Sequence, residues 1–377
     1  MQNQLKSLIK KRWLIMVLGI MGWSSWLWAA AQPVFTYNGF IDEYFQYNTV
    51  NNVAPTDRVF DQSVNTFRTA LVFLNLTAQD GNVGGVVDVN IGQTADIIAA
   101  SDTLEQHLNG GFPSDTLLEQ AYLSYSPTSQ LSIDFGKYVT HMGYEVIGTV
   151  NNLNYSNSFL FGYAIPFEAS GFKATYTFNN QYNVMVDLMN TGWQPEGTIG
   201  IQRCIGFQLN DNPSSVFGFT INGMGGDDVP NGTSYGGLKE VVEGIVNFNP
   251  TSQYYLGVDS VYGQAPTSTA VRPYTGLAFY TSYALSTHWK LAARVERLSD
   301  TTDETGFNAV VGSVATAVQE GTLTLIHTIG PLTIKAEFRY DEALNAMGRL
   351  TPLFADATGS NSHSTQKTYT TGIVYSF

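Results

Sequence analysis

The sequence predicts an all-β protein, a transmembrane antiparallel β-barrel of about sixteen strands with short periplasmic turns and long extracellular loops. Runs of roughly ten residues with alternating apolar and polar side chains are separated by connectors that are alternately short and long. The chain ends in an amphipathic strand whose last residue is Phe377. Charged residues make up only 13% of the chain and aromatic residues another 13%, whereas charged residues alone are about 25% of a typical soluble protein.

The N-terminal segment 1–31 is predicted to be a signal peptide that is removed on export. Basic residues between positions 6 and 12 precede an apolar run at 14–28, and three alanines at 29–31 supply a small-residue cleavage site. A retained membrane anchor is the alternative. With the signal peptide removed, the barrel comprises residues 32–377.

Charge and cysteine content exclude several classes of protein. Four of the 18 basic residues and none of the 31 acidic residues lie in the signal peptide, so the exported part has 14 basic residues and a net charge of -17. Such a chain does not bind nucleic acid by counterion release. Cys204 is the single cysteine, so no intramolecular disulfide forms. After the signal peptide no run approaches the ~18 apolar residues of a membrane-spanning helix.

The strand count follows from the connectors. Short connectors rich in Asn, Asp, Gly, Pro and Ser lie at 79–81, 126–129, 179–180, 211–213, 249–251, 285–286 and 330–331. Longer connections lie at 49–63, 97–115, 142–163, 191–197, 226–234, 264–271, 299–313 and 343–366. Seven turns that alternate with eight loops require sixteen strands, with both chain ends on the side of the turns; fourteen or eighteen strands remain open because strand boundaries are approximate.

Alternation within the strands predicts which residues face water inside the barrel. In 332–341 one face is apolar, and the other carries Lys335, Glu337, Arg339 and Asp341. No strand buried in a soluble core needs four such charges. The same reasoning gives a set of candidate pore-lining residues: Asp88, Asp134, Asp187, Asp259, Lys290, Arg294, Glu296, Lys335, Glu337 and Arg339.

One position conflicts with this alternation. Arg203 is in phase with the apolar residues of 199–209, which would place a guanidinium group among lipid tails. Arginine at the membrane midplane costs about 2–4 kcal/mol. Either a β-bulge near Cys204 shifts the phase, or Arg203 lies at a membrane interface or an oligomer contact.

Residues 117–193 carry a more specific pattern. Residues 118–125 read LEQAYLSY and 134–145 read DFGKYVTHMGYE; Ile165-Pro166-Phe167, Gly171, Asn190 and Trp193 follow, and the opening strand 39–45 reads GFIDEYF. This pattern resembles the OmpL-like β-barrel porin family over about 35–193. The resemblance implies a barrel fold and an outer-membrane location.

The connection 142–163 is a candidate constriction loop. Its amides, tyrosines and one acid suit hydrogen bonding to neutral polar solutes, and the candidate residues are Glu145, Asn152, Asn154 and Tyr155. A loop that only covers the outer rim is the alternative.

No enzymatic chemistry is expected. None of the five histidines is paired in sequence with a nucleophile, and no two are close enough in sequence to suggest a metal site. Catalytic residues, metals and cofactors are therefore all predicted to be absent.

We predict a porin in the outer membrane of a Gram-negative bacterium, a water-filled channel for passive diffusion of small hydrophilic solutes and ions with mild cation preference. Its predicted partners are outer-membrane lipid, the barrel-assembly machinery and, by analogy with other sixteen-stranded porins, two further copies in a homotrimer. Tyr375 and Phe377 are the predicted assembly signal. A saturable, substrate-specific channel and a non-conducting adhesin or structural barrel are the alternatives.

Overall fold

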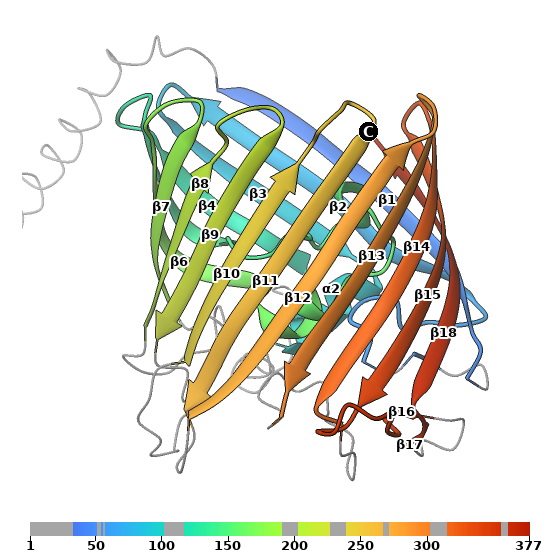
Figure 1. Cartoon of the computed structure of the whole chain (residues 1–377). Coiled ribbons are helices and arrows are strands. Elements are labelled where there is room, and N and C mark those ends of the chain that lie inside the picture. Colours follow the sequence, from blue (N-terminus) through green and yellow to red (C-terminus); the bar gives the residue numbers. More distant parts are fainter. Residues whose placement is uncertain are drawn as a thin grey trace, which may run out of the picture.

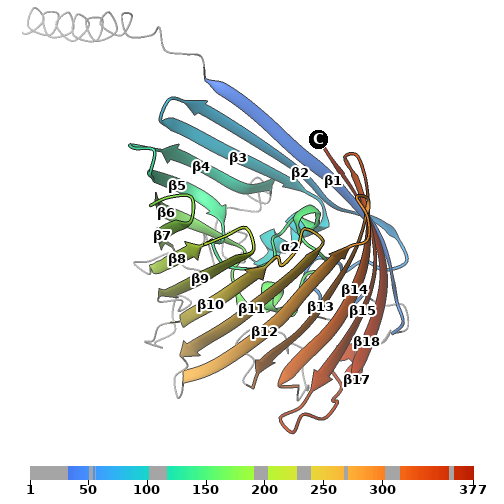
Figure 2. The same cartoon turned by 45° about the horizontal axis from the view of Figure 1, so that its top comes forward.

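In the computed structural model, described residues span 33–50, 54–55, 57–101, 117–190, 203–226, 239–266, 271–301, 315–355 and 361–377. Within them, sixteen strands form one closed antiparallel barrel (Figures 1 and 2). Each barrel strand pairs with the next one along the chain, and the last pairs with the first. The predicted fold class and strand number are therefore confirmed.

The barrel strands have the following bounds: β1 (Val34–Asn48), β2 (Phe67–Asp80), β3 (Val83–Ile91), β4 (Leu118–Tyr125), β5 (Leu131–Val139), β6 (Glu168–Thr177), β7 (Tyr182–Met189), β8 (Cys204–Asp211), β9 (Phe217–Gly226), β10 (Lys239–Phe248), β11 (Tyr254–Pro266), β12 (Val271–Ala284), β13 (Trp289–Asp300), β14 (Ala317–Ile329), β15 (Leu332–Leu344) and β18 (Thr365–Ser376). Outside the wall lie α2 (Gln93–Ser101), the 3₁₀ turn η3 (Thr149–Asn151), the π-helical turn η4 (Leu160–Ala164) and the pair β16 (Phe354–Ala355) with β17 (Asn361–His363).

The seven short connectors join successive strands where the sequence placed them. Two of them use glycine in the left-handed region, with φ of +60° at Gly81 and +58° at Gly330, which side chains with a Cβ rarely adopt. The short connections lie at the same end as the C-terminus, the upper end in Figure 1. We call this the turn end, and the opposite end, where the longer connections lie, the loop end.

The strands present apolar side chains outward and polar side chains inward. In β15, Lys335, Glu337 and Arg339 are buried inside the barrel, whereas Ala336 and Phe338 face outward. Exposed aromatic residues gather at the turn end of the outer face: Phe35, Tyr37, Tyr125, Phe178, Tyr182, Phe217, Phe248, Tyr254, Tyr283, Trp289, Tyr375 and Phe377. Such a belt is typical of a barrel wall at a membrane interface.

Arg203 lies immediately before β8, at the loop end of the wall. Ile205 and Phe207 face outward, and Cys204 lies inward, so Arg203 keeps the outward phase. The pairing of β7 with β8 runs without a register shift from Met189 opposite Cys204. The bulge considered for this position is therefore absent, and the guanidinium lies at the rim of the barrel, away from its middle.

Residues 1–32 lie outside the described part, so the signal peptide at 1–31 stays a prediction. Among the described residues, no helix is both long enough and apolar enough to span a membrane. The helical segments are short, and α2 lies inside the ring of strands, as Figure 2 shows.

The last strand closes the barrel as expected from the sequence. Residues 368–376 of β18 pair with residues 40–48 of β1. At the turn end, the Phe377 amide donates to the Gly39 carbonyl at 2.9 Å, and the Gly39 amide donates to the Phe377 carbonyl at 3.0 Å. A Cβ at Gly39 would lie 2.8 Å from the Phe377 ring, so glycine leaves room for this terminal aromatic side chain.

We predict that deletion of Phe377 reduces the amount of barrel assembled in the membrane at least severalfold, because it removes both of these hydrogen bonds and the terminal ring. Phe377→Tyr is the control and should assemble normally. The measurement is the fraction of heat-modifiable protein in isolated membranes. Equal fractions for the deletion and the control would contradict the prediction.

Candidate functional site

The interior of the barrel is narrowed by the connection between β5 and β6. This stretch, residues 140–167, contains the predicted constriction loop and is called the inward segment below. The segment changes direction near Gly143. The φ of this glycine is +106°, and a Cβ at this position would lie 2.8 Å from the Ile165 side chain. The Gly143 amide donates to both carboxylate oxygens of Glu243 on β10, at 3.1 and 2.8 Å. The chain therefore turns into the barrel instead of continuing outward.

Wall carboxylates accept hydrogen bonds from the backbone of the inward segment. Glu337 of β15 accepts from the amides of Tyr155 and Ser156. Glu296 of β13 accepts from the amides of Phe159 and Leu160. These bonds satisfy donors that have no helix or sheet partner, which is required wherever irregular backbone is buried.

Wall cations hold the carbonyl groups of the same segment. Lys335 Nζ donates to the carbonyls of Thr149, Asn152 and Asn154, the last at 3.2 Å. Arg339 donates to the Asn157 carbonyl at 2.6 Å. Both side chains are at most 1% exposed.

Arg294 joins the inward segment to the wall through three contacts. Its guanidinium donates to Glu145 Oε1 at 2.6 Å, to the Ser156 carbonyl at 2.7 Å and to Glu320 Oε1 at 2.6 Å. Arg294 is 1% exposed. Charge-assisted bonds of this kind are about twice as strong as neutral ones.

Candidate constriction residues all lie in the buried part of the inward segment. The Tyr155 hydroxyl donates to Asp42 Oδ1 at 3.0 Å, and Asn154 Nδ2 donates to Thr324 Oγ1 at 2.8 Å. Asn152 bonds within the segment, to the backbone of Val146. Burial, and then the charge of Asp42, raises the pKa of Tyr155 well above its ordinary value, so its hydroxyl stays protonated and donates.

A second connection, between β1 and β2, adds two more charged residues to the buried ion pairs around the inward segment, which we call the charged cluster. Arg58 pairs with Asp61 at 2.6 Å and with Asp341 of β15 at 3.2 Å, and it donates to Thr368 Oγ1 at 2.8 Å. Burial raises the pKa of Asp61, and the nearby Arg58 partly offsets this. The connection is thereby fixed to the inner face of the last two strands.

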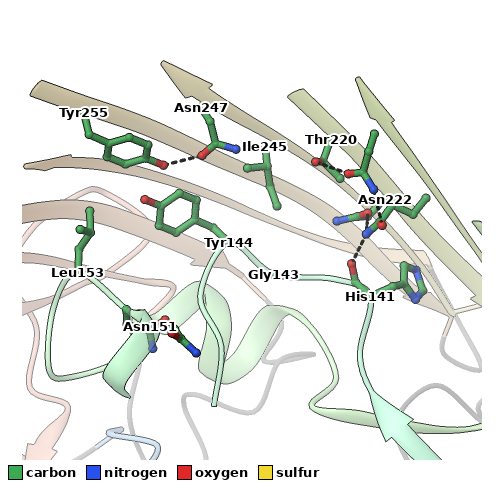
Figure 3. A pocket seen from close by; sticks show the side chains of 13 residues that line it. His141, Gly143, Tyr144, Asn151, Leu153, Thr220, Asn222, Ile245, Asn247 and Tyr255 are labelled. Carbon is green, nitrogen blue, oxygen red and sulfur yellow. Dashed lines mark hydrogen bonds between the residues drawn. The ribbon is translucent and has the colours of Figure 1, made fainter. Parts of the chain in front are cut away.

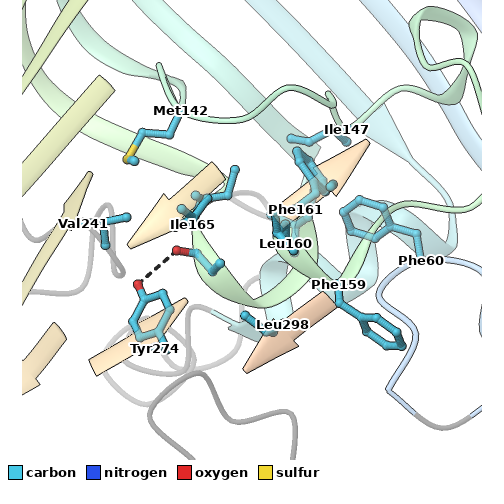
Figure 4. Packing of buried hydrophobic residues seen from close by; sticks show 14 of the residues in the cluster. Phe60, Met142, Ile147, Phe159, Leu160, Phe161, Ile165, Val241, Tyr274 and Leu298 are labelled. Atoms are coloured by element: carbon cyan, nitrogen blue, oxygen red, sulfur yellow. Dashed lines mark hydrogen bonds between the residues drawn. The ribbon is translucent and has the colours of Figure 1, made fainter. Parts of the chain in front are cut away.

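Apolar packing completes the attachment on the loop-end side. Leu160, Phe161 and Ile165 of the inward segment form one buried cluster with Val241, Tyr274 and Leu298 of the wall. Figure 4 shows this packing and the hydrogen bond from the Tyr274 hydroxyl to the Ala164 carbonyl, 3.0 Å long. The loop-end half of this wall is therefore covered by packed chain.

Of the predicted pore-lining residues, five are anchors of the inward segment or of its charged cluster: Arg294, Glu296, Lys335, Glu337 and Arg339. All five face the interior but are at most 5% exposed. Lys290, on the same face of β13 nearer the turn end, is exposed. The strand alternation thus located the inner face, and the inward segment decides which of its charges meet water.

Predicted wall acids elsewhere have local partners. Asp88 accepts from the side-chain amides of Asn75 and Gln120. Asp134 pairs with Lys173 at 3.5 Å, and both keep partial exposure, 15% and 20% for their side chains. This pair therefore reaches the open interior.

The remaining two predicted acids are buried. Asp187 Oδ2 lies 3.3 Å from His141 Nδ1, and its side chain is fully buried. Asp259 is 3% exposed and lies beside Glu243, one strand away. Among the described residues, no group of three or more His, Cys, Asp or Glu could hold a metal ion.

An open hollow of about 330 Å³ lies between the inward segment and the wall strands β8 to β11, whereas the anchors Arg294, Lys335 and Arg339 lie on β13 and β15. Its wall comes from the turn-end halves of β8, β9, β10 and β11, and its other side from the inward segment (Figure 3). The lining residues are His141, Gly143, Tyr144, Asn151, Asn152, Leu153, Gln208, Asn210, Thr220, Asn222, Ile245, Asn247 and Tyr255. None of them carries a carboxylate, ammonium or guanidinium group.

Several residues of the site were missed from the sequence. Glu320 shares the inward face of β14 with Thr322 and Thr324, and the period-two alternation of that strand could have located it. Arg58 and Asp61 lie in a connection with no periodicity. No signal in the sequence relates them to β15.

The family model described as "Putative beta-barrel porin-2, OmpL-like" matches residues 34–377. The chain belongs to this family. The match extends the resemblance noted for 35–193 to the entire barrel. A comparison with curated proteins gave no match.

Solved structures similar to this family member are outer-membrane barrels. The outer membrane channel DcaP of Acinetobacter baumannii aligns with a TM-score of 0.58 and 12% identity over 92% of this chain and 98% of that chain. The anion-selective porin from Comamonas acidovorans aligns with a TM-score of 0.59 and 12% identity over 92% of this chain and 100% of that chain. OmpT of Vibrio cholerae, in its trimer form, aligns with a TM-score of 0.56 and 11% identity over 92% of this chain and 100% of that chain. At such identities the likeness is one of fold.

We predict that Arg294→Met loosens the inward segment inside an intact barrel. Removing one partner of a buried ion pair costs about 3–5 kcal/mol, and here it also leaves Glu145 and Glu320 without their shared cation. Amide hydrogen exchange across residues 145–160 should accelerate by about two orders of magnitude or more. Lys290→Met, on the same strand face but exposed, should leave it unchanged. Exchange in Arg294→Met equal to that of the control would contradict the prediction.

Proposed function

We propose that this protein is a porin, a water-filled channel for passive diffusion of small hydrophilic solutes across the outer membrane. The observation that carries the proposal is an inward segment held against one side of a closed barrel by buried polar contacts, with an open polar hollow on its other side. Membership of a porin family supports it. In this proposal the barrel carries out no covalent chemistry and acts as a selective passage.

The inward segment sets the size limit of the channel in this proposal. Its apolar cluster and its ion pairs occupy much of the loop-end interior, so solutes pass through the space that remains beside the segment. The partly exposed pair of Asp134 and Lys173 and the exposed Lys290 then line the passage, while the buried charges act on passing ions through their field.

The charge of the anchoring cluster favours cations. It contains seven carboxyl groups and four cationic groups, a formal excess of three negative charges: Asp42, Asp61, Glu145, Glu296, Glu320, Glu337 and Asp341 against Arg58, Arg294, Lys335 and Arg339. A water-filled passage beside low-dielectric walls focuses such a field. Mild cation preference is therefore proposed for this channel, in contrast to the anion-selective porin that shares its fold.

We also propose an assembly and a location, which the same comparisons support. We place the barrel in the outer membrane of a Gram-negative bacterium, with the turn end toward the periplasm. The likeness to OmpT, for which a trimer form is known, supports a homotrimer. Outer-membrane lipid would cover the remaining apolar face.

Single-channel recording of the refolded barrel in a planar lipid bilayer tests the function. We expect discrete current steps and, in a potassium chloride gradient, a reversal potential that gives a potassium to chloride permeability ratio of about 2–5, because the field of the cluster is partly screened at ordinary salt. A folded, heat-modifiable barrel that never conducts would reject the porin and favour a surface adhesin or structural barrel. Clear chloride preference would reject the cation selectivity.

A further inference from the structure

The open hollow beside the inward segment is lined mainly by neutral hydrogen-bonding groups, together with the imidazole of His141, whose Nδ1 lies 3.3 Å from Asp187 Oδ2. Six of its lining residues carry side-chain amides: Asn151, Asn152, Gln208, Asn210, Asn222 and Asn247. Hydroxyl groups of Thr220, Tyr144 and Tyr255 add to them. Its volume of about 330 Å³ lies at the lower end of the 300–1,000 Å³ that is typical of small-molecule sites.

The amides on the wall are held in fixed orientations by one another. Gln208 Nε2 donates to the His141 carbonyl at 2.7 Å and to Asn222 Oδ1 at 2.9 Å. Asn210 Nδ2 donates to Gln208 Oε1 at 2.6 Å, and Asn210 Oδ1 accepts from Thr220 at 2.6 Å. Figure 3 shows this chain of bonds along the wall. Groups held in this way lose little conformational entropy when a ligand binds.

The same chain of bonds shields the hollow from a nearby carboxylate. Asn222 Nδ2 donates to Glu243 Oε2 at 2.6 Å, and the Gly143 amide donates to both oxygens of that carboxylate. Asn222 itself is fully buried. Both oxygens of this buried carboxylate therefore have protein donors, and the hollow presents amides in its place.

Two amide groups keep hydrogen-bonding capacity for a ligand. Asn247 Oδ1 accepts from the Tyr255 hydroxyl, while its Nδ2 has no hydrogen-bond partner among the described residues. Asn151 is exposed, and its side chain also has no hydrogen-bond partner in the part of the chain that the structure describes. They lie on opposite sides of the hollow, one on β10 and one on the inward segment (Figure 3).

Aromatic surface adjoins these amides. Tyr144 lines the hollow and stacks on Tyr280 with ring centroids 3.8 Å apart, and Tyr255 packs against Tyr144 at 6.4 Å. The stack keeps the Tyr144 ring in place. A solute with polar edges and an apolar C–H face can contact such a ring while its edges bond to the amides.

These features fit one class of ligand. A hydroxyl group both donates and accepts a hydrogen bond, and so does a side-chain amide, so the two match without any charge. A charged solute would give up part of its hydration shell and find no carboxylate, ammonium or guanidinium group in the lining. We propose that the hollow is a binding site for neutral, hydroxyl-rich solutes of the size of a monosaccharide or disaccharide, so that the channel has a saturable preference for them. This preference rests on the proposed porin function, whereas binding itself does not.

Isothermal titration calorimetry of the full barrel, refolded in detergent, tests the site. The probes are glucose, galactose and sucrose, with gluconate and glucosamine as charged counterparts. We expect saturable binding of at least one neutral sugar with a Kd on the order of 1 mM, weak enough to allow release, and at least fivefold weaker binding of gluconate and glucosamine. Failure of all three neutral sugars to bind would overturn the proposal, as would equal binding of the charged probes.

Variants connect the binding to this hollow. Asn247→Leu combined with Asn151→Leu should weaken sugar binding about tenfold or more, because both amides with spare capacity are lost. Asn38→Leu is the matched control, since Asn38 lies exposed on the inner face of β1, across the barrel. Heat-modifiability shows that each variant folds. Binding by the double variant that equals the control would overturn the assignment.

Bilayer recording with the same sugars separates this proposal from the porin function. A conducting barrel whose current sucrose blocks with a saturable dependence supports both. Conduction with no sugar binding overturns the site alone. Sugar binding by a barrel that never conducts supports the site and rejects the porin.

Discussion

The structure depends on one constraint, which is that irregular backbone inside a barrel must find hydrogen-bond partners. The inward segment has few of its own, and the wall supplies them through side chains of β13 and β15. Carboxylates hold the amides and cations hold the carbonyls, so both kinds of backbone group are satisfied. Because each of these wall charges is buried, each also needs the segment and its ionic neighbours in order to be stable there. The segment and the charged face of the last strands are therefore mutually dependent.

This dependence divides the interior into two sides. Beside β10 to β15 the apolar cluster and the ion pairs pack the chain against the wall. Beside β8 to β11, toward the turn end, the wall carries amides and hydroxyls around an open hollow. Most of the buried charges and the neutral hydrogen-bonding groups thus lie in different parts of one barrel. The field of the charges can act on ions while the neutral groups contact uncharged solutes.

The sequence was sufficient for the wall and insufficient for the interior. Alternation has a period of two in every strand, so it located the inner face of β15 from Lys335 to Asp341, and the connectors between the alternating runs predicted about sixteen strands. It carried no information about which inward charges would be covered. Lys290 and Arg294 lie on the same face of β13, and only the path of residues 140–167 leaves the first exposed and buries the second. Arg58 pairs with Asp341 across 283 positions of sequence, a contact that no local pattern encodes.

A cross-link between the inward segment and the wall tests the central claim most directly. Asn154 and Thr324 make a side-chain hydrogen bond of 2.8 Å between the segment and β14. In a Cys204→Ala background, cysteines at both positions should be joined in the folded barrel by a short bifunctional thiol reagent, seen as a mobility shift after unfolding. Single-channel conductance should stay within about twofold, because the bridge holds an arrangement that already exists. A folded barrel in which the two cysteines are not joined, or a large fall in conductance once they are joined, would mean that the segment does not lie against this wall in the working channel.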